Sequence, residues 1–224
     1  MAEDKNKYIL SINGMSKSFG RNKVLKHISL NVKPGTIMGL MGENGAGKST
    51  FIKLLYREEK ATRGKVIVDG TDVSRIKNSK VPYFRRRIGV VFQNYRLLQK
   101  KTVFENVAFA LEVTNTPKTE IRKKVRNVLE LVGLEDKANS FPHELSGGQQ
   151  QRVAIARALI AKPDIIFADE PTGNLDSKTS ADVLGLLKRT SGEFNQTIVM
   201  ITHNNEIAQL ADRIVRIEDG KIVG

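Results

Sequence analysis

A glycine-rich segment is the first group of residues whose types and spacing could do chemistry. It fits the pattern G-x-x-x-x-G-K-[ST] and consists of Gly42, Glu43, Asn44, Gly45, Ala46, Gly47, Lys48, Ser49 and Thr50. Glycines let the backbone curl so that consecutive N–H groups point at phosphate oxygens, and a helix that begins there adds its positive dipole. We expect this phosphate loop to place Lys48 at the β- and γ-phosphates and Ser49 at Mg²⁺.

A second glycine pair occurs in the segment 145–149, which reads Leu-Ser-Gly-Gly-Gln. Its polar and glycine positions are Ser146, Gly147, Gly148 and Gln149. A serine and two flexible glycines at the start of an expected helix form a second anion-binding group. Since the phosphate loop already holds one side of a nucleotide, this segment predicts that the nucleotide is held from two sides. It therefore predicts a dimer.

An acidic pair, Asp169 and Glu170, follows the apolar run 165–168. A carboxylate at the end of a strand, beside a phosphate loop, can hold Mg²⁺ directly or through water. The next carboxylate along the chain points elsewhere and can polarise an attacking water. We assign Asp169 to the metal and Glu170 to the general base. The alternative is a pair of exposed loop acids, and the apolar run before the pair disfavours it.

Other side chains extend this set. Gln93 ends an expected strand at 88–92, and its amide could bind Mg²⁺ or the attacking water. His203 follows an expected strand at 197–201 and could bond the γ-phosphate and hold the water against Glu170, although a lone histidine there is more often structural. Phe19 could stack on adenine or could be a core phenylalanine, and the residues alone leave both open.

Short apolar runs alternate with helical patterns, which predicts an α/β fold with a largely parallel sheet and helices on both faces. Strands are expected at 36–41, 65–68, 88–92, 165–168 and 197–201, and a terminal hairpin at 213–223. A helix should follow the phosphate loop at 48–56. Apolar spacing predicts another helix at 119–132, and 97–113 is expected to be mostly helical. We therefore divide a single domain, 1–224, into a core (1–93 and 145–224) and a helical insertion (94–144).

Composition excludes several classes of protein. The chain of 224 residues is long enough for one domain with a full core, and its 40% hydrophobic and 27% charged content is ordinary for a globular protein. It has no cysteine, which excludes disulfides and thiolate metal sites. The acidic N-terminus does not resemble a secretory signal, and no apolar run approaches the roughly 18 residues of a spanning helix. A cytoplasmic protein is expected.

Positive charge is concentrated in one stretch of the chain. Residues 75–126 hold 14 lysines and arginines against three acids, and so carry +11 of the net +13. Such a surface attracts nucleic acid or an anionic membrane leaflet. A solvated basic face without a partner is the alternative.

Taken in order, these segments resemble the nucleotide-binding domain of ABC transporters. The matching motifs are Phe19 (adenine-stacking loop), 42–50 (Walker A), Gln93 (Q-loop), 145–149 (signature), 165–170 (Walker B), 174–176 with Asp176 (D-loop) and His203 (switch histidine). The resemblance implies a P-loop NTPase of the ABC ATPase type, with a RecA-like core, an antiparallel β subdomain and an α-helical subdomain that carries the signature. It also implies ATP hydrolysis with Mg²⁺ in head-to-tail homodimers, in which Ser146 and Gly148 bind the ATP held by the other chain.

A narrower resemblance is to the FtsE family of bacterial cell-division ATPases. It rests on the segments 55–59, 81–86, 92–98, 102–110 and 141–144, and the chain departs from that family at Asn94 and at Glu43-Asn44. The resemblance implies a membrane partner, FtsX, whose cytoplasmic helix docks near the Q-loop and the helical subdomain. ATP-driven closure would then act through FtsX on cell-wall hydrolases, from the cytoplasmic face of the membrane at the division site.

The basic stretch suggests a hypothesis in that setting: its charges hold the protein against anionic lipid or acidic segments of FtsX. Charge reversal at Arg85, Arg86 and Arg87 would then reduce membrane association and leave ATP binding intact.

Alternative functions remain open from the residues. One is the ATPase of another ABC exporter, of the lipoprotein-release or macrolide-export type, since Asn174 is shared with that group. Another is a soluble nucleic-acid-associated ABC ATPase, which is disfavoured because the segment between Gln93 and Leu145 leaves no room for a long coiled coil. A pseudoenzyme that only binds ATP is disfavoured by the presence of Lys48, Glu170 and His203.

Overall fold

The computed structural model describes residues 7–202 and 211–223, so His203 lies outside the described residues. A six-stranded sheet, ordered β10-β9-β3-β8-β7-β6, organises the molecule. Its strands are β3 (Ile37–Met41), β6 (Gly89–Val91), β7 (Ile165–Asp169), β8 (Thr197–Ile201), β9 (Arg213–Glu218) and β10 (Lys221–Val223). All neighbours run parallel except β9 and β10, which form the expected terminal hairpin. This confirms the prediction of a largely parallel sheet.

A smaller antiparallel sheet, ordered β2-β1-β4-β5, covers one side of the molecule. Its strands are β1 (Leu10–Phe19), β2 (Asn22–Val32), β4 (Arg63–Val68) and β5 (Thr71–Asp72). In this sheet the residue pattern predicted only part of β4. Strands β1 and β2 were not predicted, because their pairing shifts register between Ile12 and Phe19. Register shifts interrupt the alternation by which a strand is recognised. The resemblance to ABC domains had implied this sheet, and it is present.

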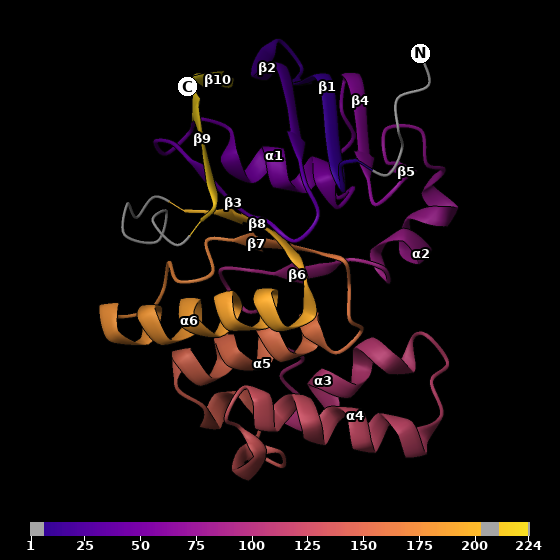
Figure 1. Ribbon diagram of the computed structural model, residues 1–224, viewed down its shortest axis with the longest axis vertical. Coiled ribbons are helices and arrows are strands. Elements are labelled where there is room, and N and C mark those ends of the chain that lie inside the picture. The colour runs from indigo at the N-terminus through magenta and orange to yellow at the C-terminus, as the bar shows by residue number, and fades with distance from the viewer. Residues whose placement is uncertain (1–6, 203–210, 224) are drawn as a thin grey trace.

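The helices of the described residues are α1 (Lys48–Leu55), α2 (Val81–Arg85), α3 (Val103–Glu112), α4 (Lys118–Leu131), α5 (Gly147–Leu159) and α6 (Ser177–Phe194). Figure 1 shows α1 between the two sheets, and α5 and α6 on the opposite face of the larger sheet. Helices α3 and α4 lie beyond α5. No described helix is long and apolar enough to cross a membrane.

Two cores lie on the two faces of the larger sheet, because side chains alternate along each strand. On β7, Ile165 and Phe167 belong to the core around α1 and the smaller sheet, whereas Ile166 and Ala168 belong to the core around α3 to α6. All four are fully buried. Strands buried on both faces are continuous apolar runs, and for this reason β7 was recognisable in the sequence.

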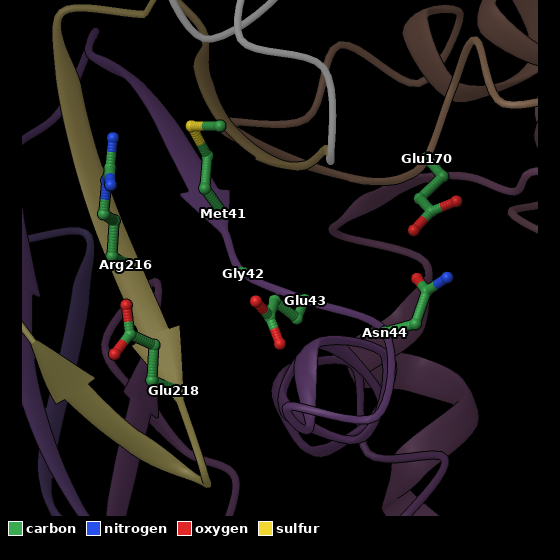
Figure 2. A pocket seen from close by; sticks show the side chains of 7 residues that line it. All are labelled: Met41, Gly42, Glu43, Asn44, Glu170, Arg216 and Glu218. Carbon is green, nitrogen blue, oxygen red and sulfur yellow. The ribbon is translucent and has the colours of Figure 1, made fainter.

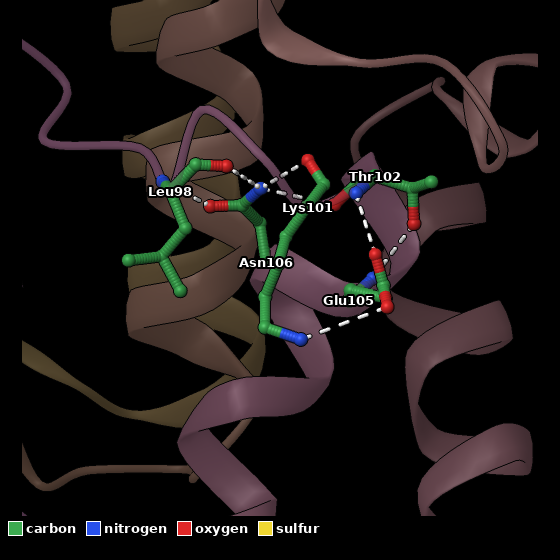
Figure 3. Close-up of polar contacts among 5 residues, drawn as sticks. All are labelled: Leu98, Lys101, Thr102, Glu105 and Asn106. Atoms are coloured by element: carbon green, nitrogen blue, oxygen red, sulfur yellow. Dashed lines mark hydrogen bonds and ion pairs between the residues drawn. The ribbon is translucent and has the colours of Figure 1, made fainter.

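The helix expected over 97–113 begins later than predicted, since α3 starts at Val103. Thr102 caps it: the Glu105 N–H donates to the Thr102 hydroxyl at 3.2 Å, and the Thr102 N–H donates to the Glu105 carboxylate at 2.8 Å. The buried Asn106 amide donates to the Leu98, Lys101 and Thr102 carbonyls and accepts from the Leu98 N–H at 2.7 Å (Figure 3). These bonds hold residues 98–102 as a turn instead of a helix.

Candidate functional site

The phosphate loop joins β3 to α1, the two elements that the sequence predicted around it. Gly47, just before α1, has a φ of 102°, and a Cβ there would lie 2.8 Å from a Leu25 methyl carbon. Only glycine fits this position without strain. No side chain caps the N-terminus of α1, so its first N–H groups have no side-chain acceptor. An anion at this end of the helix would satisfy them.

The Lys48 side chain curls back into the phosphate loop and is buried. Its ammonium donates to the carbonyl oxygens of Gly42 and Glu43, at 2.8 and 2.9 Å. The cation is therefore held by the same loop whose N–H groups would face phosphate. Ser49 is exposed in the first turn of α1. The loop thus supplies N–H groups, one buried cation and one exposed hydroxyl, which together match the chemistry of a phosphate chain with its divalent cation.

A pocket of about 550 Å³ opens beside the phosphate loop. It is lined by Met41, Gly42, Glu43, Asn44, Glu170, Arg216 and Glu218. Figure 2 shows the Glu170 carboxylate and the Asn44 amide pointing toward one another, with Arg216 and Glu218 across the pocket on β9. The sequence predicted that Glu170 would lie near the loop. Arg216 and Glu218 were missed, since only the pairing of β9 with β3 brings them there.

The acidic pair turns sharply at the end of β7. Asp169 is the last residue of the strand and is half-buried, whereas Glu170 has a φ of 45°, which turns its side chain away from the line of the strand. Burial raises the pKa of Asp169, and the nearby Glu170 charge raises it further, while Lys53 and Arg96 oppose the shift. A cation bound near Asp169 would stabilise its charged form and so oppose both upward shifts of its pKa. In the described residues, no cluster of three or more histidines or acids could hold a metal.

The side chains of Gln93 and Glu170 both lie close to Gly173. A Cβ at Gly173 would lie 2.7 Å from the Gln93 amide nitrogen and 3.3 Å from a Glu170 carboxylate oxygen. The Asn174 amide donates to the Gln93 carbonyl at 3.1 Å. The structure therefore brings together side chains from the ends of β6 and β7, as parallel neighbours in a sheet require. Glycine at 173 leaves the space that both side chains occupy.

Arg157 on α5 is a residue that the sequence analysis missed. Its guanidinium donates to the carbonyl oxygens of Tyr95 and Arg96, at 2.8 and 2.7 Å. Both of those residues are left-handed, with φ values of 59° and 47°. Burial lowers the pKa of Arg157, yet the guanidinium remains charged near neutral pH. One signal existed in the sequence: Arg157 interrupts an otherwise apolar face of the helix.

The signature segment begins α5. The Gln149 N–H donates to the Ser146 hydroxyl at 3.3 Å, and the Ser146 N–H donates to the Gln149 side chain at 2.9 Å. Neither Gly147 nor Gly148 has a positive φ. A Cβ at Gly148 would lie 2.3 Å from a Thr179 methyl carbon, and one at Gly147 would lie 3.1 Å from the Tyr95 hydroxyl. Both glycines therefore permit close packing at the start of α5.

None of residues 146–149 is among the described residues that line the pocket of their own chain. Ser146 is exposed at the start of α5. Asp176 caps α6, where it accepts from the Thr179 N–H at 2.9 Å and from the Thr179 hydroxyl at 2.6 Å. These bonds lower the pKa of Asp176.

Phe19 is 47% exposed at the end of β1. The Lys17 ammonium lies 4.4 Å from the centre of its ring. The possibility of a core phenylalanine is therefore excluded, and one face of an aromatic ring is available at this turn.

The fold and this arrangement of side chains define a class of protein. The sequence model of the ABC transporter family matches residues 25–173, and the chain belongs to this family. Solved ABC cassettes share its fold: the dimeric cassette MJ0796 bound to ADP and Pi superposes with a TM-score of 0.88 at 37% identity, over 96% of this chain and 97% of that one. CbiO1 from Clostridium perfringens superposes with a TM-score of 0.90 at 30% identity, over 97% of this chain and 88% of that one. The chain is an ABC ATPase, as the sequence predicted.

Among curated relatives, the chain is 51% identical to the cell division ATP-binding protein FtsE of Bacillus subtilis, over 90% of this chain and 88% of that protein. It is 49% identical to FtsE of Streptococcus pneumoniae strain D39, over 89% of this chain and 86% of that protein. It is also 44% identical to the methionine import ATP-binding protein MetN 1 of Bacillus licheniformis, over 96% of this chain and 66% of that protein.

Proposed function

We propose that this chain is the ATP-hydrolysing subunit of an FtsE–FtsX-type complex that controls cell-wall hydrolysis during division. The observation that carries the proposal is the 51% identity with a cell-division ATP-binding protein over nine tenths of the chain. The pocket beside the phosphate loop supplies the chemistry, because it joins that loop to Glu170.

In the proposed site, the loop N–H groups and Lys48 bind the phosphates of ATP. Ser49, Asp169 and the Gln93 side chain would hold Mg²⁺, and the cation would neutralise charge that develops during phosphoryl transfer. Glu170 accepts a proton from the attacking water, and Gln93, whose side chain also lies beside Gly173, orients that water. His203 would bond the γ-phosphate. Phe19 stacks on adenine.

A second copy of the chain completes this site. Ser146, Gly147, Gly148 and Gln149 line no part of the pocket of their own chain. Ser146 is exposed, so it is accessible to ATP held by a second copy. Asp176 lies in the same interface. The similar cassette MJ0796 is dimeric when bound to ADP and Pi. We propose that ATP closes two copies head to tail and that hydrolysis releases them.

The movement of dimer closure would be transmitted to a membrane partner that binds a groove of about 430 Å³ between α2, α3 and the loop after Gln93. Apolar residues line much of it, among them Pro82, Ile88, Phe92, Phe109 and Val113. Phe109 is 42% exposed there. We propose that this groove receives a cytoplasmic helix of an FtsX-like membrane protein. Residues 94–144 would then move as one helical lobe, with the protein at the cytoplasmic face of the membrane.

A second candidate function is methionine import, which the 44% identity to a MetN protein favours. Affinity capture of the chain from membranes, followed by identification of the co-purifying membrane protein, separates the two. The cell-division proposal predicts a four-span FtsX-like protein. Capture of an importer permease in its place would overturn that proposal and leave the ATPase assignment intact.

A further inference from the structure

Residues 73–104 contain no acidic residue and nine lysines and arginines. In the structure, some of these cations have partners within the chain and others have no ion pair. Arg85 donates to the carbonyl oxygens of Tyr56 and Arg57, both at 3.0 Å. Arg87 pairs with Asp69 and donates to the Thr71 hydroxyl at 3.2 Å. Both arginines therefore hold loops of the fold together, and reversing their charge would damage the fold as well as the surface.

Other cations of this segment are paired with acids. Arg75 lies 3.8 Å from Asp72, Arg96 lies 3.5 Å from Glu58, and Lys101 lies 3.6 Å from Glu105. The cations that remain have no ion pair within the part of the chain that the structure describes. They are Lys77, Lys80, Arg86 and Lys100.

Two of these unpaired cations enclose an exposed aromatic ring. Tyr83 on α2 is 58% exposed. The Lys80 ammonium lies 5.4 Å from the centre of its ring, and the Arg86 guanidinium carbon lies 5.0 Å from it. Helix α2 buries Val81 and Phe84 against the core and turns Tyr83 outward. In Figure 1, α2 lies at the margin of the molecule.

We propose that Lys77, Lys80, Tyr83 and Arg86, here called the α2 surface, bind the surface of an anionic phospholipid bilayer. Lysines and arginines are attracted to anionic headgroups. Tyrosine rings settle at the depth of the headgroups, with the apolar ring inward and the hydroxyl in water. Lys77, Lys80 and Tyr83 are exposed and face outward, which suits contact with a flat bilayer better than binding of an acidic peptide.

The position of the α2 surface agrees with this assignment, which rests on the proposed membrane role. Arg86 of the α2 surface also lines the groove proposed for the membrane partner, together with Pro82 from the same helix. A partner that emerges from the bilayer into that groove would bring α2 toward the headgroups. The α2 surface would then orient the ATPase beneath its partner.

The purified chain, without any partner, can be tested by co-sedimentation with two kinds of vesicle, phosphatidylcholine alone and phosphatidylcholine mixed with phosphatidylglycerol. We expect binding to the mixed vesicles only, weakened at high salt because screening shortens the range of the attraction. The double variant K80E/R86E should bind at least about tenfold more weakly. Its melting temperature should match that of the wild type, which shows that the fold is intact. Binding to neither kind of vesicle would overturn the proposal, as would a preference for an acidic peptide over the vesicles.

A matched control separates a defined surface from net charge. Arg122 and Lys123 are exposed on α4, in the same basic stretch, and R122E/K123E changes the net charge by the same amount as K80E/R86E. The proposal predicts near-normal vesicle binding for this control. An equal loss in both double variants would overturn the α2 surface as the binding site.

Tyr83 allows a direct measurement, because the chain has no tryptophan. In the variant Tyr83→Trp, the single indole should shift its emission to shorter wavelength when mixed vesicles are added. Tyr83→Ala should bind several-fold more weakly without any change of charge. Unshifted emission in a variant that still sediments with the vesicles would overturn the proposal. These experiments contain no partner protein, so their failure would leave the FtsX-type function untouched.

Discussion

Arg157 on α5 donates to the backbone carbonyl oxygen of Tyr95 at 2.8 Å. This bond ties the helix that begins with the signature segment to the loop that follows Gln93. Tyr95 in turn places its hydroxyl against Gly147. Gln93 is proposed to act on the ATP bound by its own chain, and the signature segment on the ATP bound by the other chain. A few direct contacts within one chain therefore link these two parts of the proposed site.

Replacing Arg157 with Lys should uncouple these two parts of the site. Lysine can satisfy only one of the two carbonyls, and a half-buried carbonyl left without a donor costs about 1–3 kcal/mol. We expect a lower melting temperature, and a kcat that falls by a larger factor than the affinity for ATP, since the phosphate loop itself is unchanged. Arg152→Lys on the same helix is the control, because within the part of the chain that the structure describes Arg152 forms a single ion pair, with Asp182 at 3.8 Å. Equal effects of both substitutions on kcat would refute a positioning role for Arg157.

Gly148→Ala tests the packing of the signature segment. The added Cβ would lie 2.3 Å from the Thr179 methyl carbon, and such overpacking typically costs about 1–3 kcal/mol. Thr179→Ser removes that methyl and keeps the hydroxyl that bonds Asp176. The double variant should therefore regain most of the free energy of unfolding lost in Gly148→Ala. Chemical denaturation measures all three variants, and an absence of rescue would contradict this contact.

The pKa of Asp169 predicts how the stability of the ligand-free protein depends on pH. Its folded-state pKa is raised above the ordinary value of 3.8, by burial first and then by Glu170. Between these two pKa values the folded state binds more protons than the unfolded state, so stability falls as pH rises through that window. Asp169→Asn should flatten this slope, raise the melting temperature near neutral pH and lower Mg²⁺-dependent turnover. Thermal melts across pH check this, and an unchanged slope would count against it.

Local patterns in the sequence predicted the elements whose signals are local. The phosphate loop, the buried run of β7 and the apolar face of α4 each depend on neighbouring residues, and each was found. The turn at 98–102 was missed because it depends on the Asn106 side chain reaching back along the chain. Strands β1 and β2 were missed because register shifts break their alternation.

Parts of the site depend on contacts between distant segments, and these were beyond sequence patterns. Arg216 and Glu218 enter the pocket only because β9 pairs with β3. Arg85 and Arg87 look equivalent to Arg86 in sequence, yet each has internal partners that only the folded chain reveals. The roles assigned to the site residues, including that of His203, stay predictions until they are measured.

Glu170→Gln tests the central claim most directly: that two copies close on ATP and that Glu170 activates the water that cleaves it. Glutamine keeps the shape of the side chain but cannot accept the proton, so turnover should fall by at least about 10²-fold while ATP still binds. The control is Glu193→Gln, an exposed acid near the end of α6, which should hydrolyse ATP normally. The measurement is the molar mass of the Glu170→Gln protein in solution with Mg²⁺ and ATP, together with its rate of phosphate release. The account predicts a stable dimer that retains uncleaved ATP, and a monomer or a normal rate of phosphate release would contradict it.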